Sequence, residues 1–117
     1  MYTLSIKRVY DKPSSSDGVR IIVDRLWPRG ESKEKAHIDL WLKEVAPSND
    51  LRKWFNHEPD KFKEFSKKYS EELKNNNSVN QIIDILKTKN VSLIYAAKDE
   101  QINQAVVLRN FILKKLH

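Results

Sequence analysis

The sequence contains no cysteine, only two glycines, and no uninterrupted apolar run longer than five residues. Because the chain has no cysteine thiolate, it cannot form disulfides, thiolate zinc sites or iron–sulfur ligation, and it has no cysteine nucleophile. Two glycines are too few for a Walker loop or a dinucleotide-binding loop. A transmembrane helix needs about 20 apolar residues, so none is expected. The opening decapeptide is too short and too interrupted for a signal peptide, and we expect a cytoplasmic protein with no membrane contact.

The 117 residues suit one domain spanning residues 1–117. Lysine and arginine total 22 against 16 acids, giving a formal net charge of +6. The lysines are spread along the chain among acidic residues, which is typical of solvated helix faces. Four of the six arginines instead fall in the first quarter of the chain: Arg8, Arg20, Arg25 and Arg29. Because arginine makes bidentate contacts with anions, these four carry the more informative charge signal.

Apolar spacing predicts three strands and five helical stretches. Residues 2–10 alternate in polarity, and residues 20–24 and 91–97 are short apolar runs typical of buried strands. The helical stretches are 38–45, 48–55, 59–73, 78–86 and 99–116, with Ser48, Ser78 and Asp99 as expected N-caps. This order predicts a small three-layer α/β domain, with a short, mostly parallel sheet of about three strands flanked by helices.

The direction of the first strand stays open. The segment from Asp11 to Val19 is shorter than the usual parallel crossover, so its length alone favours antiparallel pairing with the second strand. Arg8 lies in line with the apolar face of this strand. A parallel first strand would bring Arg8 and Arg20 into a site at the carboxyl ends of the strands. An antiparallel one would place Arg8 at the opposite end.

Charged side chains follow the strands predicted at 20–24 and 91–97. Parallel sheets bind their ligands at this edge, beyond the carboxyl ends of the strands. Asp24 and Arg25 end the second strand, Arg29 follows in a Trp-Pro-Arg-Gly loop, and Lys98 and Asp99 lead into the last helix. Arg25, Arg29 and Lys98, together with free helical N–H groups, favour a phosphate or a carboxylate.

Two acids stand among these cations. Asp24 or Asp99 could transfer protons, with Asn103 orienting the ligand. The structural alternative is that Asp24 and Arg25 only close the sheet edge, and that Asp99 is only an N-cap.

The histidines do not suggest a metal site, because His37, His57 and His117 are isolated and none has HxxxH spacing. We therefore expect no metal and no cofactor. His57 follows Trp54 and Phe55 and is interpreted as a packing or C-capping residue.

Several strings together resemble the YeaO-like family, the short branch of the domain of unknown function 488 proteins. They are Arg8-Val-Tyr-Asp11, Asp17-Gly-Val-Arg20, Val23-Asp-Arg-Leu-Trp-Pro-Arg-Gly30, Trp41-Leu-Lys-Glu-Val-Ala-Pro-Ser48, Leu51-Arg-Lys-Trp-Phe55 with His57, and Tyr95-Ala-Ala-Lys-Asp99 with Asn103.

The resemblance implies an α/β fold with these residues on strand ends and loops, and it implies no particular activity. Longer relatives carry cysteines near the region of Tyr95 to Asn103, where this chain has none. The Asp-Arg strand end is also loosely similar to rhodanese-type sulfurtransferases, but persulfide chemistry needs a thiolate and is excluded here.

Two hypotheses follow from the sequence. The first is a pocket for a phosphate- or carboxylate-bearing ligand, such as a nucleotide or a nucleic-acid end, with or without catalysis. The second is a non-catalytic module that holds nucleic acid or an acidic protein on the same basic edge. The oligomeric state stays undetermined.

Overall fold

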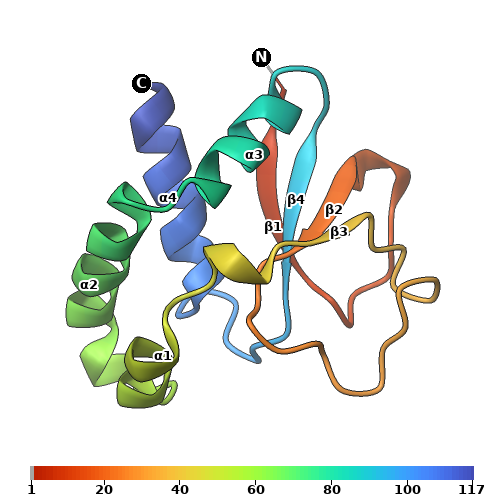
Figure 1. The fold of residues 1–117 in the computed structure, drawn as a ribbon. Helices are drawn as coiled ribbons and strands as arrows, with labels where there is room; N and C mark the ends of the chain where they lie inside the picture. Colours follow the sequence, from red (N-terminus) through yellow and green to blue (C-terminus); the bar gives the residue numbers. More distant parts are fainter. Residues whose placement is uncertain (1) are drawn as a thin grey trace.

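Four parallel strands form the sheet of this protein, in the order β1-β4-β2-β3 (Figure 1). The computed structural model describes residues 2–117. The strands are β1 (Leu4–Arg8), β2 (Val19–Ile22), β3 (Leu40–Trp41) and β4 (Val91–Tyr95). The predicted α/β class with a parallel sheet is therefore confirmed, with four strands in place of about three.

The direction of β1 differs from the expectation based on loop length. β1 pairs in parallel with β4, and β2 pairs in parallel with the opposite side of β4, so β1 and β2 are not neighbours. Residues 9–18, at roughly 3.3 Å per residue, can reach roughly 33 Å. Returning along β1 takes roughly 17 Å, and crossing two strand spacings takes roughly 10 Å. The segment is therefore long enough to make a parallel connection without a crossover helix.

Gly18 joins the turn before β2 to the turn before β4. Its φ is +67°, and a Cβ placed there would lie 2.1 Å from the carbonyl oxygen of Asn90. The next residue, Val19, donates its N–H to the same carbonyl at 2.8 Å. The close approach of the two turns therefore requires a residue without a side chain.

The helices are α1 (Asn49–Phe55), α2 (Phe62–Lys74), α3 (Ser78–Leu86) and α4 (Gln104–Leu116). Four of the five predicted helical stretches correspond to them. Ser48 caps α1 as predicted, since its side chain accepts the N–H of Leu51 at 3.2 Å.

The helix predicted over 38–45 is wrong. That segment contains β3 and a short 3-10 turn at Lys43–Val45. The backbone N–H groups of Asp39 and Leu42 donate to carbonyls of β2. Pairing with the sheet edge therefore replaces helical bonding. Of the apolar stripe expected for this helix, Ile38, Leu42 and Val45 are buried, whereas Trp41 is exposed.

Two predicted caps also differ from the structure. Asn77, not Ser78, is the N-cap of α3. Asn103 is the N-cap of α4, and its side chain accepts the N–H of Val106 at 3.0 Å. Asp99 lies in the turn before this helix, so α4 begins four residues later than an N-cap at Asp99 would place it.

The sheet separates two hydrophobic clusters. All four helices pack on one face, in a cluster that includes Leu93, Phe65 and Leu108. The other face is covered by the irregular chain after β2, through Trp27, Ala36 and Ile38 among others. Figure 1 shows this arrangement, with the helices to the left of the sheet. Within residues 2–117, no helix is both long and apolar enough to cross a lipid bilayer.

Candidate functional site

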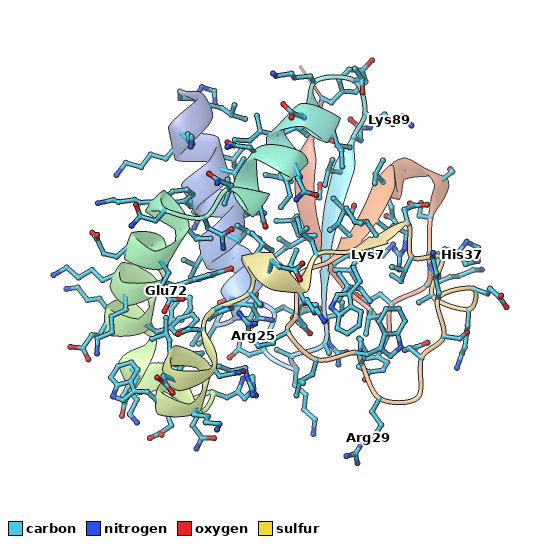
Figure 2. The ribbon with its side chains drawn as sticks, in the orientation of Figure 1. Lys7, Arg25, Arg29, His37, Glu72 and Lys89 are labelled. Carbon is cyan, nitrogen blue, oxygen red and sulfur yellow. The ribbon has the colours of Figure 1, made fainter. Side chains whose placement is uncertain are left out.

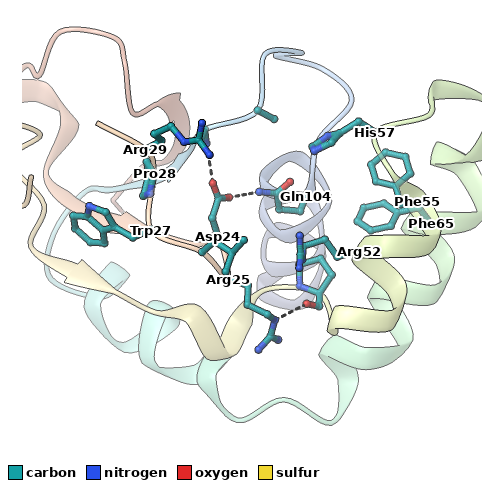
Figure 3. Close-up of a pocket in the computed structure, with 14 residues that line it drawn as sticks. Asp24, Arg25, Trp27, Pro28, Arg29, Arg52, Phe55, His57, Phe65 and Gln104 are labelled. Carbon is teal, nitrogen blue, oxygen red and sulfur yellow. Dashed lines mark hydrogen bonds between the residues drawn. The ribbon is translucent and has the colours of Figure 1, made fainter. Parts of the chain in front are cut away.

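A pocket of about 300 Å³ opens at the carboxyl ends of β2 and β4 (Figure 3). It is lined by the loop after β2, the end of β4 with the start of α4, and α1 with the turn that follows it. Its polar lining residues are Asp24, Arg25, Arg29, Arg52, His57 and Gln104. Its apolar lining residues are Leu26, Trp27, Pro28, Pro47, Phe55, Phe65, Ala96 and Ala97. The pocket lies at the sheet edge where the sequence placed its candidate site.

Among the described residues that line this pocket, Asp24 is the one acid. Its carboxylate accepts the backbone N–H of Ala96 at 2.9 Å and a hydrogen bond from the amide of Gln104. Burial raises the pKa of Asp24 to about 6, and the two hydrogen bonds only partly offset that rise. A carboxyl group with such a pKa exchanges protons near neutral pH.

Arg25, the next residue, turns toward α1. Its Nε donates to the carbonyl of Pro47 at 3.0 Å, and one terminal nitrogen donates to the carbonyl of Ala46 at 3.2 Å. These bonds fix the segment that leads into α1. Arg25 thus lines the pocket and also holds one of its walls.

Arg29 is exposed at the outer end of the loop that follows β2 (Figure 2). The loop is ordered on both sides of it: the indole N–H of Trp27 donates to the carbonyl of Glu31 at 2.8 Å, and the hydroxyl of Tyr10 donates to the carbonyl of Arg29 at 3.2 Å. Pro28 is buried beside it. The guanidinium is therefore presented to solvent from an ordered backbone.

Arg52 on α1 and His57 in the turn after it line the pocket, and the sequence patterns assigned neither residue to the site. The Nε of Arg52 is buried and has no hydrogen-bond partner within residues 2–117. Asn56 and His57 both have positive φ, at 47° and 55°, so the chain turns sharply after α1 and places His57 at the pocket. The His57 ring also lies 6.1 Å from that of Phe55, which agrees with a packing role.

Gln104 is the third residue missed. It lies in the first turn of α4 and donates to Asp24. No local pattern links residues so far apart in the chain. The one available signal for Arg52 and His57 was their presence in a string that carried the family resemblance.

Arg8 and Lys98 do not line the pocket. Arg8 comes to the carboxyl edge because β1 is parallel, but its Nε donates to the carbonyl of Ala97 at 2.9 Å. Its guanidinium also lies 5.2 Å from the ring centre of Tyr10. Lys98 is exposed just beyond β4. Arg8 therefore supports the pocket wall from behind.

Asp99 and Asn103 serve the start of α4. The Asp99 carboxylate accepts the N–H groups of Gln101 and Ile102, both at 2.9 Å, and these bonds lower its pKa. Asn103 is buried, and its amide donates to the carbonyl of Asp99 at 2.8 Å. Neither residue lines the pocket.

Arg20 lies on β2, away from the pocket. It is buried and bonds Asp17 at 2.6 Å and the carbonyl of Ala36 at 3.0 Å. Lys7 also bonds Asp17 at 3.1 Å. Burial raises the pKa of Asp17, but the N–H of Ser14, Lys7 and Arg20 outweigh it and lower the pKa overall. This cluster stabilises the sheet and its flanking turn.

The charged side chains of the pocket are not paired with each other. Within the described residues, no ion pair closer than 4.0 Å involves Asp24, Arg25, Arg29 or Arg52. Nor do residues 2–117 contain a group of three or more His, Asp or Glu side chains that could hold a metal ion.

The sequence matches the family model DUF488-N3i, described as the inactive DUF488-N3 subclade, over residues 3–117. The chain belongs to this family. It is 41% identical over 110 residues to the uncharacterized protein YeaO of Escherichia coli K12, covering 93% of this chain and 96% of the relative. It is 34% identical over 107 residues to the uncharacterized protein Rv3073c of Mycobacterium tuberculosis H37Rv, covering 92% and 91%. No solved structure gives a significant match.

The resemblance to the YeaO-like proteins is thus confirmed over nearly the whole chain. The description of DUF488-N3i names no ligand and calls the subclade inactive. The pocket of this DUF488-N3i protein must therefore be interpreted from its own side chains.

Proposed function

We propose that this DUF488-N3i protein is a binding domain for a small ligand with a phosphate or carboxylate group. The observation that carries the proposal is the set of arginines in the pocket, Arg25, Arg29 and Arg52, which have no ion-pair partner in residues 2–117. Arginine presents planar donors that match these anions. An anion bound here would supply the missing partner.

The shape of the pocket supports a ligand with an apolar or planar body. Most of its wall is apolar, with Trp27, Phe55 and Phe65 among the lining side chains. Its volume of about 300 Å³ lies at the lower end of the range for small-molecule sites. Apolar walls with a few charged groups are the usual composition of such sites.

Asp24 carries a second candidate function, proton transfer to or from the bound ligand. Its pKa of about 6 is suited to a general acid or base, and it lines the pocket. The description of the subclade as inactive favours binding without turnover. We therefore place binding first and treat turnover as an outcome of the same experiments.

The proposal is tested by thermal unfolding with phosphates, carboxylates, nucleotides and short oligonucleotides. A ligand at 100 times its Kd should stabilise the protein by about 2.7 kcal/mol, which raises Tm by several degrees. Arg29→Ala should weaken binding about tenfold or more, because a hydrogen bond to a charged group contributes roughly 1.5–3 kcal/mol. Its own Tm should stay near that of the wild type, since Arg29 is exposed.

Lys89→Ala is the matched control. Lys89 is an exposed cation at the other end of the sheet from Arg29 (Figure 2), and its loss changes the net charge equally. Equal effects of the two variants would show a diffuse charge effect and contradict the pocket. Stabilisation by oligonucleotides alone, falling steeply with salt, would favour the nucleic-acid module. No stabilisation by any of these compounds would contradict the proposal.

A further inference from the structure

Asp24 is a negative charge in a pocket that otherwise carries positive ones. It lies largely buried beside Ala96 and Gln104, whereas Arg52 approaches from α1 and His57 from the turn after α1 (Figure 3). An anion alone would satisfy the arginines and leave Asp24 without a counter-charge. The pocket therefore contains two recognition elements of opposite sign.

The fold keeps these opposite charges apart. Asp24 is held by the N–H of Ala96 and the amide of Gln104. Its neighbour Arg25 is turned away by bonds to the carbonyls of Pro47 and Ala46. Each partner is a backbone group or a neutral amide, so the hydrogen bonds orient the charges without neutralising them.

Such an arrangement is costly in the empty protein. A buried carboxylate without a counter-charge loses hydration that two neutral donors only partly replace, as the raised pKa of Asp24 reflects. A ligand that brings a positive group to Asp24 relieves this cost. The free energy gained in this way adds to the free energy with which the arginines bind the anionic group.

We propose that the ligand is zwitterionic, with a protonated amine bound at Asp24 and a carboxylate or phosphate bound by the pocket arginines. This inference rests on the proposed anion-binding function and adds to it. Gln104 assists at the amine end, because its side-chain oxygen is an acceptor next to the carboxylate. Arg29 and Arg52 serve the anionic end.

Two matched sets of probes test the inference by isothermal titration at pH 7.5, where Asp24 is mostly ionised. One set is L-phenylalanine, 3-phenylpropionate and 2-phenylethylamine. The other is O-phosphoethanolamine, ethyl phosphate and ethylamine. In at least one set, the zwitterion should bind about tenfold or more tightly than either singly charged analogue. The set that binds distinguishes a carboxylate ligand from a phosphate ligand.

Asp24→Asn should abolish this preference. The variant should bind the zwitterion no more tightly than the anion-only probe, while its affinity for the anion-only probe is kept or improved. Asp84→Asn is the matched control, because Asp84 is an exposed carboxylate on α3 remote from the pocket lining. It should leave all affinities unchanged.

The possible failures are distinguishable. Anion-only probes that bind as tightly as the zwitterions would overturn the zwitterion inference and leave the anion pocket intact. A preference for zwitterions that survives in Asp24→Asn would overturn the role of Asp24. No binding of any anion-bearing probe at millimolar concentration would overturn both proposals. If Asp24→Asn does not fold, the comparison of probes on the wild type still decides.

Discussion

Asp24 and Asp17 place the same side chain in two different surroundings. The Asp17 carboxylate accepts hydrogen bonds from Lys7, Arg20 and a backbone N–H. These bonds lower its pKa, although burial acts in the opposite direction. Asp24 receives one backbone N–H and one neutral amide, and burial raises its pKa to about 6. The first carboxylate stabilises the sheet, whereas the second is left available at a pocket.

This contrast predicts opposite pH dependences of stability. The unfolded pKa of Asp24 is near 4, so the folded protein binds its proton more tightly, and the stability of the folded state falls as the pH rises from about 4 through 6. The unfolding free energy of the wild type minus that of Asp24→Asn should therefore fall across this range, by on the order of 3 kcal/mol. Urea unfolding followed by tryptophan fluorescence measures it.

Asp17→Asn provides the comparison. Because the folded pKa of Asp17 is lowered, its stabilising contribution is present above about pH 4 and is lost as the pH falls through the folded value. Its difference from the wild type should be flat between pH 5 and 7. A flat difference for Asp24→Asn over the same range would show that Asp24 is not held in a charge-disfavouring site.

At the scale of elements, the pocket depends on how turns and loops join the strands. The turn before β2 packs on the turn before β4 at Gly18. The loop after β2 contains Arg29, which is followed directly by a second glycine, Gly30. Both glycines have positive φ, at +67° and +79°. They differ in surroundings, since a side chain at Gly30 would meet nothing within 4 Å.

Gly18→Ala should therefore destabilise the protein more than Gly30→Ala. Positive φ costs alanine roughly 1 kcal/mol or more at either site. The added contact with Asn90 should bring the loss at Gly18 to at least about 2 kcal/mol in urea unfolding. Equal losses for the two variants would mean that the two turns are not as closely packed as the structure shows.

At the scale of the whole molecule, the sequence predicted what local patterns encode. Apolar spacing located four helices, because burial on one face imposes a helical period. The short apolar runs located β2 and β4, because these strands are covered on both faces of the sheet. The same spacing at Ile38, Leu42 and Val45 misled, since a segment beside a sheet edge can bury the same positions without forming a helix.

Features that depend on distant pairing could not be predicted from the sequence. β4 enters between β1 and β2 from the last third of the chain and so sets the direction of β1. The strand ends predicted an edge with Asp24, Arg25 and Arg29, and these three residues line one pocket there. Arg52 and Gln104 reach that edge only through the packing of α1 and α4, which no local pattern records.

An NMR titration of the ¹⁵N-labelled protein with 3-phenylpropionate and with ethyl phosphate tests directly whether the pocket binds anions. At least one of these anions should shift the indole N–H of Trp27 and the backbone amides of Ala96 and Gln104, and leave those of Arg20 and Lys89 in place. Arg29→Ala should weaken the response. Shifts spread over the lysines of α2, or no shifts at all, would contradict an anion-binding pocket at the carboxyl ends of the strands.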